Sequence, residues 1–243
     1  GIPQIISSAL STTIFPLICS KHKTINEKNE IISFSYKMIF AFCVPCVCVF
    51  MFFSKPIVSL LYSDGLSYGN INQLDVASHI IKIVSTMVIY SSLSSFTTSL
   101  LQAENKSFKA CQNLLFGSII SIICFIFLVK NPQINILGDS LSALIGVSIT
   151  ALLNIKDLSK TNTPKINFKK VIAMPLVSSC IMIVVMKFVF SALCGVLPAK
   201  ILIMFSCFIG FVIYVLLLII LKVFNMQEIS ILKPIKISKN GLN

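Results

Sequence analysis

Arginine and tryptophan are both absent from the 243 residues, and charged residues of every kind make up only 12% of them. An ordinary soluble domain carries roughly 25% charged residues, so this scarcity excludes that class. All 20 basic residues are lysines, and they are scattered between apolar stretches. Recognition of bases and phosphates favours the guanidinium group, and a binding surface needs its cations on one face. The sequence therefore argues against nucleic-acid binding.

Groups that commonly carry catalysis are also scarce. The two histidines, His22 and His79, stand alone, and there is no nucleophile paired with a base, no glycine-rich phosphate loop and no metal-binding motif. No acidic residue lies deep within an apolar stretch, which argues against a proton-carrying carboxylate in a membrane interior. We therefore expect no enzyme activity and no cofactor.

Cysteine is abundant, with nine residues, and the densest group is Cys43, Cys46 and Cys48 around Pro45. These three lie inside an uncharged apolar stretch with no histidine nearby, so a zinc site would require desolvated thiolates and an absent fourth ligand. Cysteine acting as a small hydrophobic residue explains the group better. We expect no metal site and no structural disulfide.

Apolar residues make up 56% of the chain, and the mean hydropathy is +0.94. A helix needs about 20 mainly apolar residues to cross a bilayer. The sequence thus predicts an all-α polytopic membrane protein. Charged residues separate seven candidate transmembrane helices, at 1–20, 38–54, 83–103, 110–129, 140–155, 171–186 and 201–221. Pro45 and Pro175 fall inside two of them, where proline frees backbone carbonyls that neighbouring helices can satisfy.

Lysine is distributed unevenly between alternate connections. Those after the first, third, fifth and seventh stretches carry most of the lysines, whereas the opposite side holds only Lys55, Lys130 and Lys200. Lysine-rich connections stay cytoplasmic, so this asymmetry predicts a multi-pass protein of the cell membrane with a cytoplasmic C-terminus. The chain starts without an initiator methionine and its first residue would lie outside. We therefore expect a fragment that lacks upstream sequence.

The third stretch carries polar residues spaced three, four or seven apart, which places them along one helical face. They are Ser78, Lys82, Ser85, Ser92, Ser95, Ser99 and Gln102. The first stretch repeats the pattern more weakly with Gln4, Ser8 and Ser11. Such a face is costly against lipid, so it should meet either a water-filled cavity or a packed helix. In a cavity these residues would be substrate contacts, and Lys82 could meet an anionic head group.

Small residues recur every four positions at Gly138, Ser142, Gly146 and Thr150. A ridge of this kind lets two helices approach closely, so we interpret it as a packing surface. Lys187 lies towards one end of the sixth stretch, where its side chain can reach the interface between lipid and water.

Three parts of the chain resemble passages of one known family. Residues 100–106 (LLQAENK) and 109–117 (KACQNLLFG) resemble a passage that joins two of its helices. Residues 134–138 (INILG) and 151–158 (ALLNIKDL) resemble a later passage, and the opening residues 2–18 resemble another. The family that these motifs resemble is the polysaccharide-exporter branch of the multidrug/oligosaccharidyl-lipid/polysaccharide flippase superfamily.

The resemblance implies a MATE-like transporter of fourteen helices in two lobes. Residues 1–158 would form the C-terminal lobe, with family helices eight to twelve, and residues 159–243 would add the last two helices and a cytoplasmic tail. Alternating access would move a lipid-linked oligosaccharide or peptidoglycan precursor across a bacterial cytoplasmic membrane. The implied partners are membrane lipids, the lipid-linked saccharide and a missing N-terminal lobe. In related flippases the final helix pair forms a groove for the lipid tail.

The leading hypothesis is therefore a flippase lobe that serves spore cortex or envelope polysaccharide biosynthesis. One alternative is a multidrug or cation antiporter of the same superfamily, although these usually have twelve helices. Another is a structural membrane protein or degenerate remnant that transports nothing.

Overall fold

The structure is a computed structural model. It describes residues 24–62, 71–131, 134–160, 169–193, 198–221 and 223, together with Ile5, Ser8, Ala9, Thr12, Thr13 and Pro16. Within this part of the chain every regular element is a helix, and six helices are long and apolar enough to cross a membrane. The first expected helix, over residues 1–20, lies largely outside the described residues.

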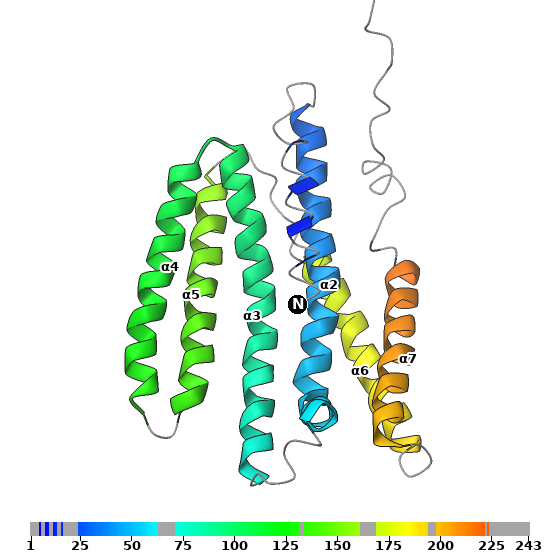
Figure 1. Cartoon of the computed structure of the whole chain (residues 1–243). Helices are drawn as coiled ribbons and strands as arrows, with labels where there is room; N and C mark the ends of the chain where they lie inside the picture. Colours follow the sequence, from blue (N-terminus) through cyan, green and yellow to red (C-terminus); the bar gives the residue numbers. More distant parts are fainter. Residues whose placement is uncertain are drawn as a thin grey trace, which may run out of the picture.

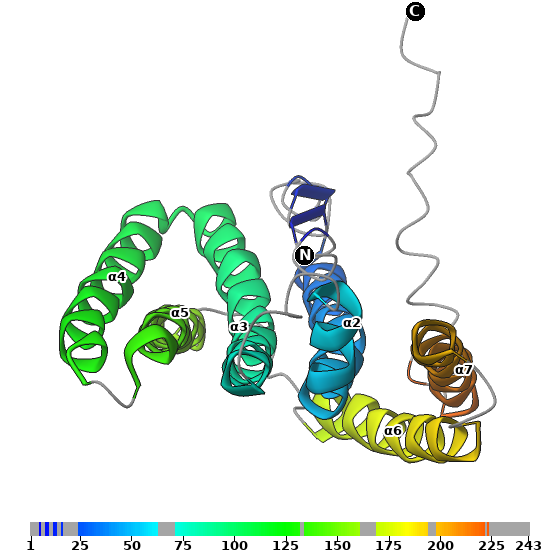
Figure 2. The same cartoon turned by 60° about the horizontal axis from the view of Figure 1, so that its bottom comes forward.

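The helices follow one another with short connections. They are α2 (Ile25–Tyr62), α3 (Ile71–Ala103), α4 (Ser107–Val129), α5 (Asn135–Leu158), the short π-helix η1 (Lys169–Ala173), α6 (Met174–Ala192) and α7 (Ala199–Ile220). They stand side by side in the order α4, α5, α3, α2, α6 and α7, and each long helix runs in the opposite direction to the one before it in the chain (Figures 1 and 2).

The helices are longer than the sequence predicts, and the difference is largest for α2 and α3. The second helix was expected at 38–54 but spans Ile25–Tyr62, and the third was expected at 83–103 but begins at Ile71. The prediction treated charged residues as helix ends, yet Lys37 and Lys82 lie inside these helices. The true start of α2 is a capping box, in which the Thr24 hydroxyl accepts from the Glu27 amide and the Glu27 carboxylate accepts from the Thr24 amide.

Helix α2 changes direction at Phe53, whose backbone angles (φ −109°, ψ 18°) are not helical. Pro56 follows three residues later, and proline disrupts the helical geometry of the preceding turn. By contrast, α2 stays helical through Pro45. Helix α2 is therefore continuous from Ile25 to the change of direction at Phe53.

Helices α3, α4 and α5 form one compact group. A Cβ atom added to Gly146 of α5 would lie 2.6 Å from Cβ of Ser121 in α4. One added to Gly138 would lie 2.9 Å from the Leu128 carbonyl carbon. The close helix approach predicted from the small-residue ridge is thus confirmed.

Helix α2 joins this group to α6 and α7 through two apolar clusters. On one side Tyr36 of α2 packs edge-on against Phe96 of α3, with ring centroids 5.0 Å apart. On the other side Met182 and Met186 of α6 pack with Tyr214 of α7. The part of α2 between these clusters is consequently buried on two faces.

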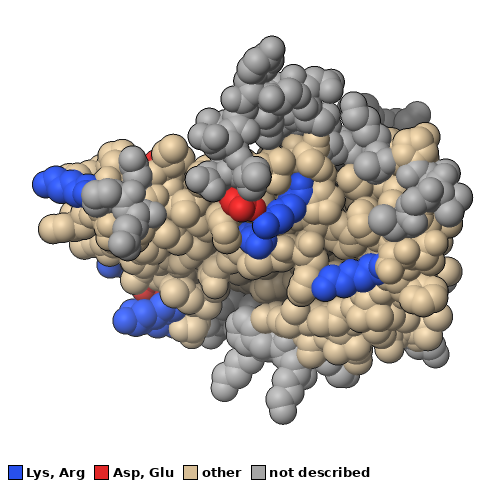
Figure 3. Space-filling model, turned by 90° about the horizontal axis from the view of Figure 1, so that it is seen from below, with Lys and Arg blue, Asp and Glu red and all other residues tan. Residues whose placement is uncertain are grey.

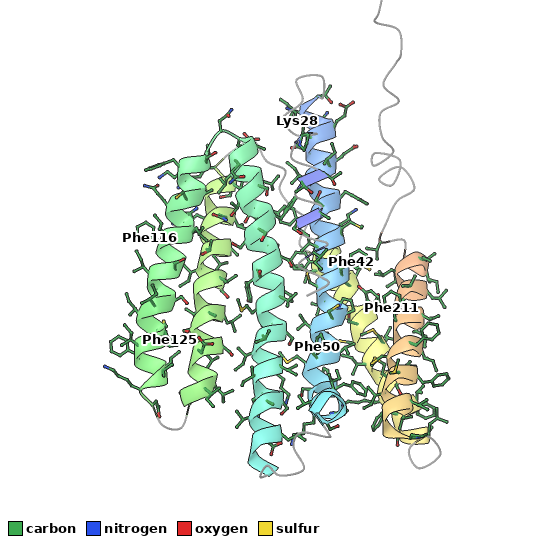
Figure 4. All side chains as sticks on the ribbon, in the orientation of Figure 1. Lys28, Phe42, Phe50, Phe116, Phe125 and Phe211 are labelled. Carbon is green, nitrogen blue, oxygen red and sulfur yellow. The ribbon has the colours of Figure 1, made fainter. Side chains whose placement is uncertain are left out.

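The outer surface of α4 is almost wholly apolar, and Phe116 and Phe125 project from it (Figure 4). The exposed large side chains of this helix are Phe108, Leu114, Leu115, Phe116, Ile119, Ile122, Ile123, Phe125, Ile126 and Phe127. A surface of this size and composition is not compatible with water but suits the hydrocarbon of a bilayer. The molecule is therefore an all-α polytopic membrane protein, as the sequence predicts.

Candidate functional site

An apolar groove of about 540 Å³ lies between α2 and α7, with Met182 of α6 also in its wall. Its volume falls within the range of about 300–1,000 Å³ that is typical of ligand pockets. Figure 4 labels Phe42 and Phe50 on α2 and Phe211 on α7, which are three of its aromatic residues. The other lining residues are Met38, Ala41, Pro45, Cys46, Val49, Cys207, Tyr214, Val215, Leu218 and Ile219.

Helical spacing explains why these residues share the groove. On α2 the lining positions recur at intervals of three or four residues from Met38 to Phe50, and on α7 they recur likewise from Cys207 to Ile219. Residues at such intervals lie on one face of a helix. All the lining residues are uncharged, and the Tyr214 hydroxyl is engaged with a backbone carbonyl. The groove therefore suits a hydrocarbon chain and offers no set of ligands for a metal or charged cofactor.

A second feature is a buried polar network that connects α3, α4 and α5. The side-chain amide of Asn113 in α4 donates to Oδ1 of Asn154, at 3.0 Å, and to Oδ2 of Asp157, at 3.1 Å. The amide of Asn154 donates in turn to the hydroxyls of Thr97, at 3.2 Å, and Thr98, at 3.0 Å, in α3. We name these five residues the polar network.

The polar network is well satisfied. Asn154 is fully buried, Asn113 is 6% exposed, and the Thr97 hydroxyl also donates to the Leu93 carbonyl at 2.7 Å. In a low-dielectric interior, such hydrogen bonds hold helices in one register. The Lys160 ammonium lies 3.4 Å from the other carboxylate oxygen of Asp157, Oδ1, at the end of α5. The arrangement thus fixes three helices to one another near one end of the molecule.

Sequence reasoning did not assign the polar network. Asn154 and Asp157 belong to the 151–158 motif that was noted only for its family resemblance. A signal was present, because Asn154 and Asp157 lie three positions apart and therefore share one face of the helix. What the sequence could not supply is the identity of their partners on α3 and α4.

The polar residues predicted on the third helix do not gather into one site. Ser78, Ser85 and Ser92 are buried, whereas Ser95 and Gln102 are exposed, and Lys82 and Ser99 are half-buried. None of them lines the apolar groove. The hydroxyls of Ser78 and Ser85 donate to carbonyls of their own helix, those of Asp75 and Lys82, at 2.7 Å each.

The weaker polar pattern near the start of the chain is only partly visible. Ser8 is helical and exposed, and its hydroxyl donates to the Ile5 carbonyl at 2.8 Å. Gln4 and Ser11 lie outside the described residues.

Isolated charges mark the end of the molecule where α2 finishes and α3 begins (Figure 3). Lys55 forms a 2.7 Å ion pair with Asp75, and both side chains are exposed. The Lys187 ammonium lies 4.8 Å from the centre of the Phe52 ring, a cation–π arrangement. Lys187 is exposed, as expected for a lysine that reaches the membrane interface.

Comparison with known families gives a match over the first part of the chain. Residues 3–68 match the family model described as "Lipid II flippase MurJ". The matched segment contains α2, and therefore one whole wall of the apolar groove. No curated protein and no solved structure matches the chain. Over this segment the chain is similar to a family of flippases that handle a lipid-linked substrate.

Proposed function

We propose that this chain is the C-terminal lobe of a flippase that moves a lipid-linked saccharide or peptidoglycan precursor across a membrane. The single observation that carries the proposal is the apolar groove between α2 and α7. It is supported by the family match over residues 3–68 and by six helices that can cross a membrane.

The chemistry of such a substrate explains why a groove of this kind is useful. A lipid-linked precursor has a long hydrocarbon tail and a charged head group, and only the head group must avoid the bilayer interior. The tail gains nothing from polar contacts but is held by close packing against apolar side chains. A groove with uncharged walls and three phenylalanine side chains, Phe42, Phe50 and Phe211, provides that packing.

The head group needs a separate, polar surface, and we assign it to the polar face of α3 together with residues of a proposed N-terminal lobe. Lys82 is the cation on this face, and it is half-buried beside the buried Ser78 and Ser85. The other candidate contacts on this helix that are not buried are Ser95, Ser99 and Gln102. Residues 1–158 would then supply the lobe proper, and α6 and α7 would complete the groove for the tail.

The proposed orientation follows from the position of the lysines. Lys106 and Lys109 lie at the α3–α4 connection, and Lys156 and Lys160 lie at the end of α5, which is the same end of the molecule (Figure 1). Because lysine-rich connections stay in the cytoplasm, this end would be cytoplasmic. The end with Lys55 and Asp75 would face outward.

The motifs at 100–117 and 134–158 favour the polysaccharide-exporter branch, and within it a relative of stage V sporulation protein B. The corresponding role would be in the synthesis of spore cortex or envelope polysaccharide. The helices α6 and α7, which follow the proposed lobe of residues 1–158, favour this branch over the twelve-helix antiporters.

Photolabelling tests the proposal. The full native protein in membranes would be exposed to a polyprenyl phosphate that carries a photoreactive group in its tail, and the labelled peptides would be identified by mass spectrometry. We expect labels on α2 and α7, and we expect Val215→Trp, which fills the groove, to suppress them. Val212→Trp is the matched control, because Val212 lies on the same helix outside the groove and is 40% exposed, against 37% for Val215. Equal labelling of both variants would contradict the proposal.

A further inference from the structure

Pro45 leaves one backbone carbonyl of α2 without its helical partner. In an α-helix the amide of each residue donates to the carbonyl four positions earlier, and proline has no amide hydrogen. The carbonyl affected is that of Ala41, which is 3% exposed. In a membrane interior no water is available to satisfy it, so an unpaired carbonyl here would be costly.

Tyr214 of α7 supplies the missing donor. Its hydroxyl donates to the Ala41 carbonyl at 2.7 Å, across 173 residues of sequence. Tyr214 itself is 2% exposed, so its hydroxyl also needs a partner. The bond therefore satisfies two buried groups at once, and it does so only when α7 lies at one particular height along α2.

The bond lies in the wall of the apolar groove, because Ala41, Pro45 and Tyr214 are all lining residues. Around it, Tyr214 packs in a buried cluster with Met182 and Leu218. These apolar contacts have no fixed direction, so they permit α7 to slide or rotate slightly against α2. A hydrogen bond has a defined length and angle, so the bond from Tyr214 to Ala41 adds a directional contact to this apolar packing.

We propose that Tyr214 is a positioning residue of the apolar groove: its hydroxyl replaces the amide hydrogen that Pro45 lacks and so fixes α7 against α2 at the spacing the ligand tail requires. The identity of the ligand rests on the function proposed above. The hydrogen bond from Tyr214 to the Ala41 carbonyl, which Pro45 leaves free, does not depend on that function.

A double-mutant cycle tests the pairing in the full native protein. Tyr214→Phe removes only the hydroxyl, and Pro45→Ala restores an amide hydrogen to the Ala41 carbonyl. If the Pro45→Ala variant does not accumulate in cells, Pro45→Leu is used instead, because it restores the same amide hydrogen. The matched control is Tyr36→Phe, because Tyr36 is 3% exposed on α2 but packs against Phe96, away from the groove.

Two readouts are measured on each variant: the thermal unfolding midpoint in detergent and the dissociation constant of a fluorescent polyprenyl phosphate. Tyr214→Phe in the parent should lower the midpoint and weaken binding about threefold, the size of an average interhelical hydrogen bond in a membrane protein. In the Pro45→Ala background the same substitution should change both values much less. Tyr36→Phe should have the same effect in both backgrounds.

Equal effects of Tyr214→Phe in the two backgrounds would overturn the pairing. The effects of the two substitutions on the unfolding midpoint could be coupled while all variants bind the probe with the same dissociation constant. That result would overturn the role of Tyr214 as a positioning residue of the apolar groove. If the midpoints are coupled but neither the parent nor any variant binds the probe, the pairing stands and the proposed lipid-tail function fails.

Discussion

Asn154 should be the most important polar side chain for the packing of α3, α4 and α5. It takes part in three side-chain hydrogen bonds, with Asn113, Thr97 and Thr98. An interhelical hydrogen bond in a membrane protein contributes about 0.6 kcal/mol on average, so Asn154→Leu should lose about 2 kcal/mol of unfolding free energy. Leucine is similar in size, and the Asn113 amide keeps its bond to Asp157, which limits further losses.

Thermal unfolding of the purified protein in detergent measures this loss. For a chain of this size, about 2 kcal/mol corresponds to a decrease of about 4–8 °C in the unfolding midpoint. Gln102→Leu is the control, because it removes an exposed amide from α3 and should leave the midpoint nearly unchanged. A decrease for Asn154→Leu no larger than that for Gln102→Leu would refute the role given to the polar network.

Three further predictions concern packing, surface charge and the groove. Gly146→Val should lose about 1–3 kcal/mol, because its Cβ would lie 2.6 Å from Cβ of Ser121; an unchanged unfolding midpoint would contradict the close packing of α4 and α5. Lys55→Gln and Asp75→Asn should each leave the midpoint nearly unchanged, since both side chains are exposed and screened. A large decrease for either would mean that the pair is shielded from water. Tyr214→Phe should destabilise the parent protein more than the Pro45→Ala variant, as the double-mutant cycle described above measures.

The fold class could be predicted from the sequence because a bilayer requires long apolar helices and the chain contains little else. Helix ends were predicted less well for a physical reason. Lys37 and Lys82 were taken to end helices, but a helix can continue beyond the hydrocarbon, and a long lysine side chain can reach the interface from inside it.

The polar residues predicted to share one face of α3 differ in their exposure along the helix. Ser78, Ser85, Ser92 and Ser99 repeat every seven residues, and such a repeat drifts by about 20° per heptad around a straight helix. The first three are buried, and Ser99 is half-buried. A set that looks like one face in the sequence is thus spread over two environments in the molecule.

The candidate groove depends on contacts that no local pattern contains. The sequence does predict that Pro45 frees a carbonyl for a neighbouring helix, and the hydrogen bond from Tyr214 to Ala41 confirms it. It does not identify Tyr214 as the donor, because α7 follows α2 only after five intervening helical elements. Asn113 and Asn154 were missed for the same reason, since their pairing is tertiary.

Transbilayer movement of a lipid-linked saccharide tests the central claim most directly. The full native protein would be reconstituted into vesicles with a fluorescent polyprenyl-linked saccharide, and loss of the outer-leaflet signal to an added quencher would report movement. The account predicts movement with the parent protein and with Val212→Trp, and strongly reduced movement with Val215→Trp. No movement with the parent, or equal rates for the two tryptophan variants, would contradict it.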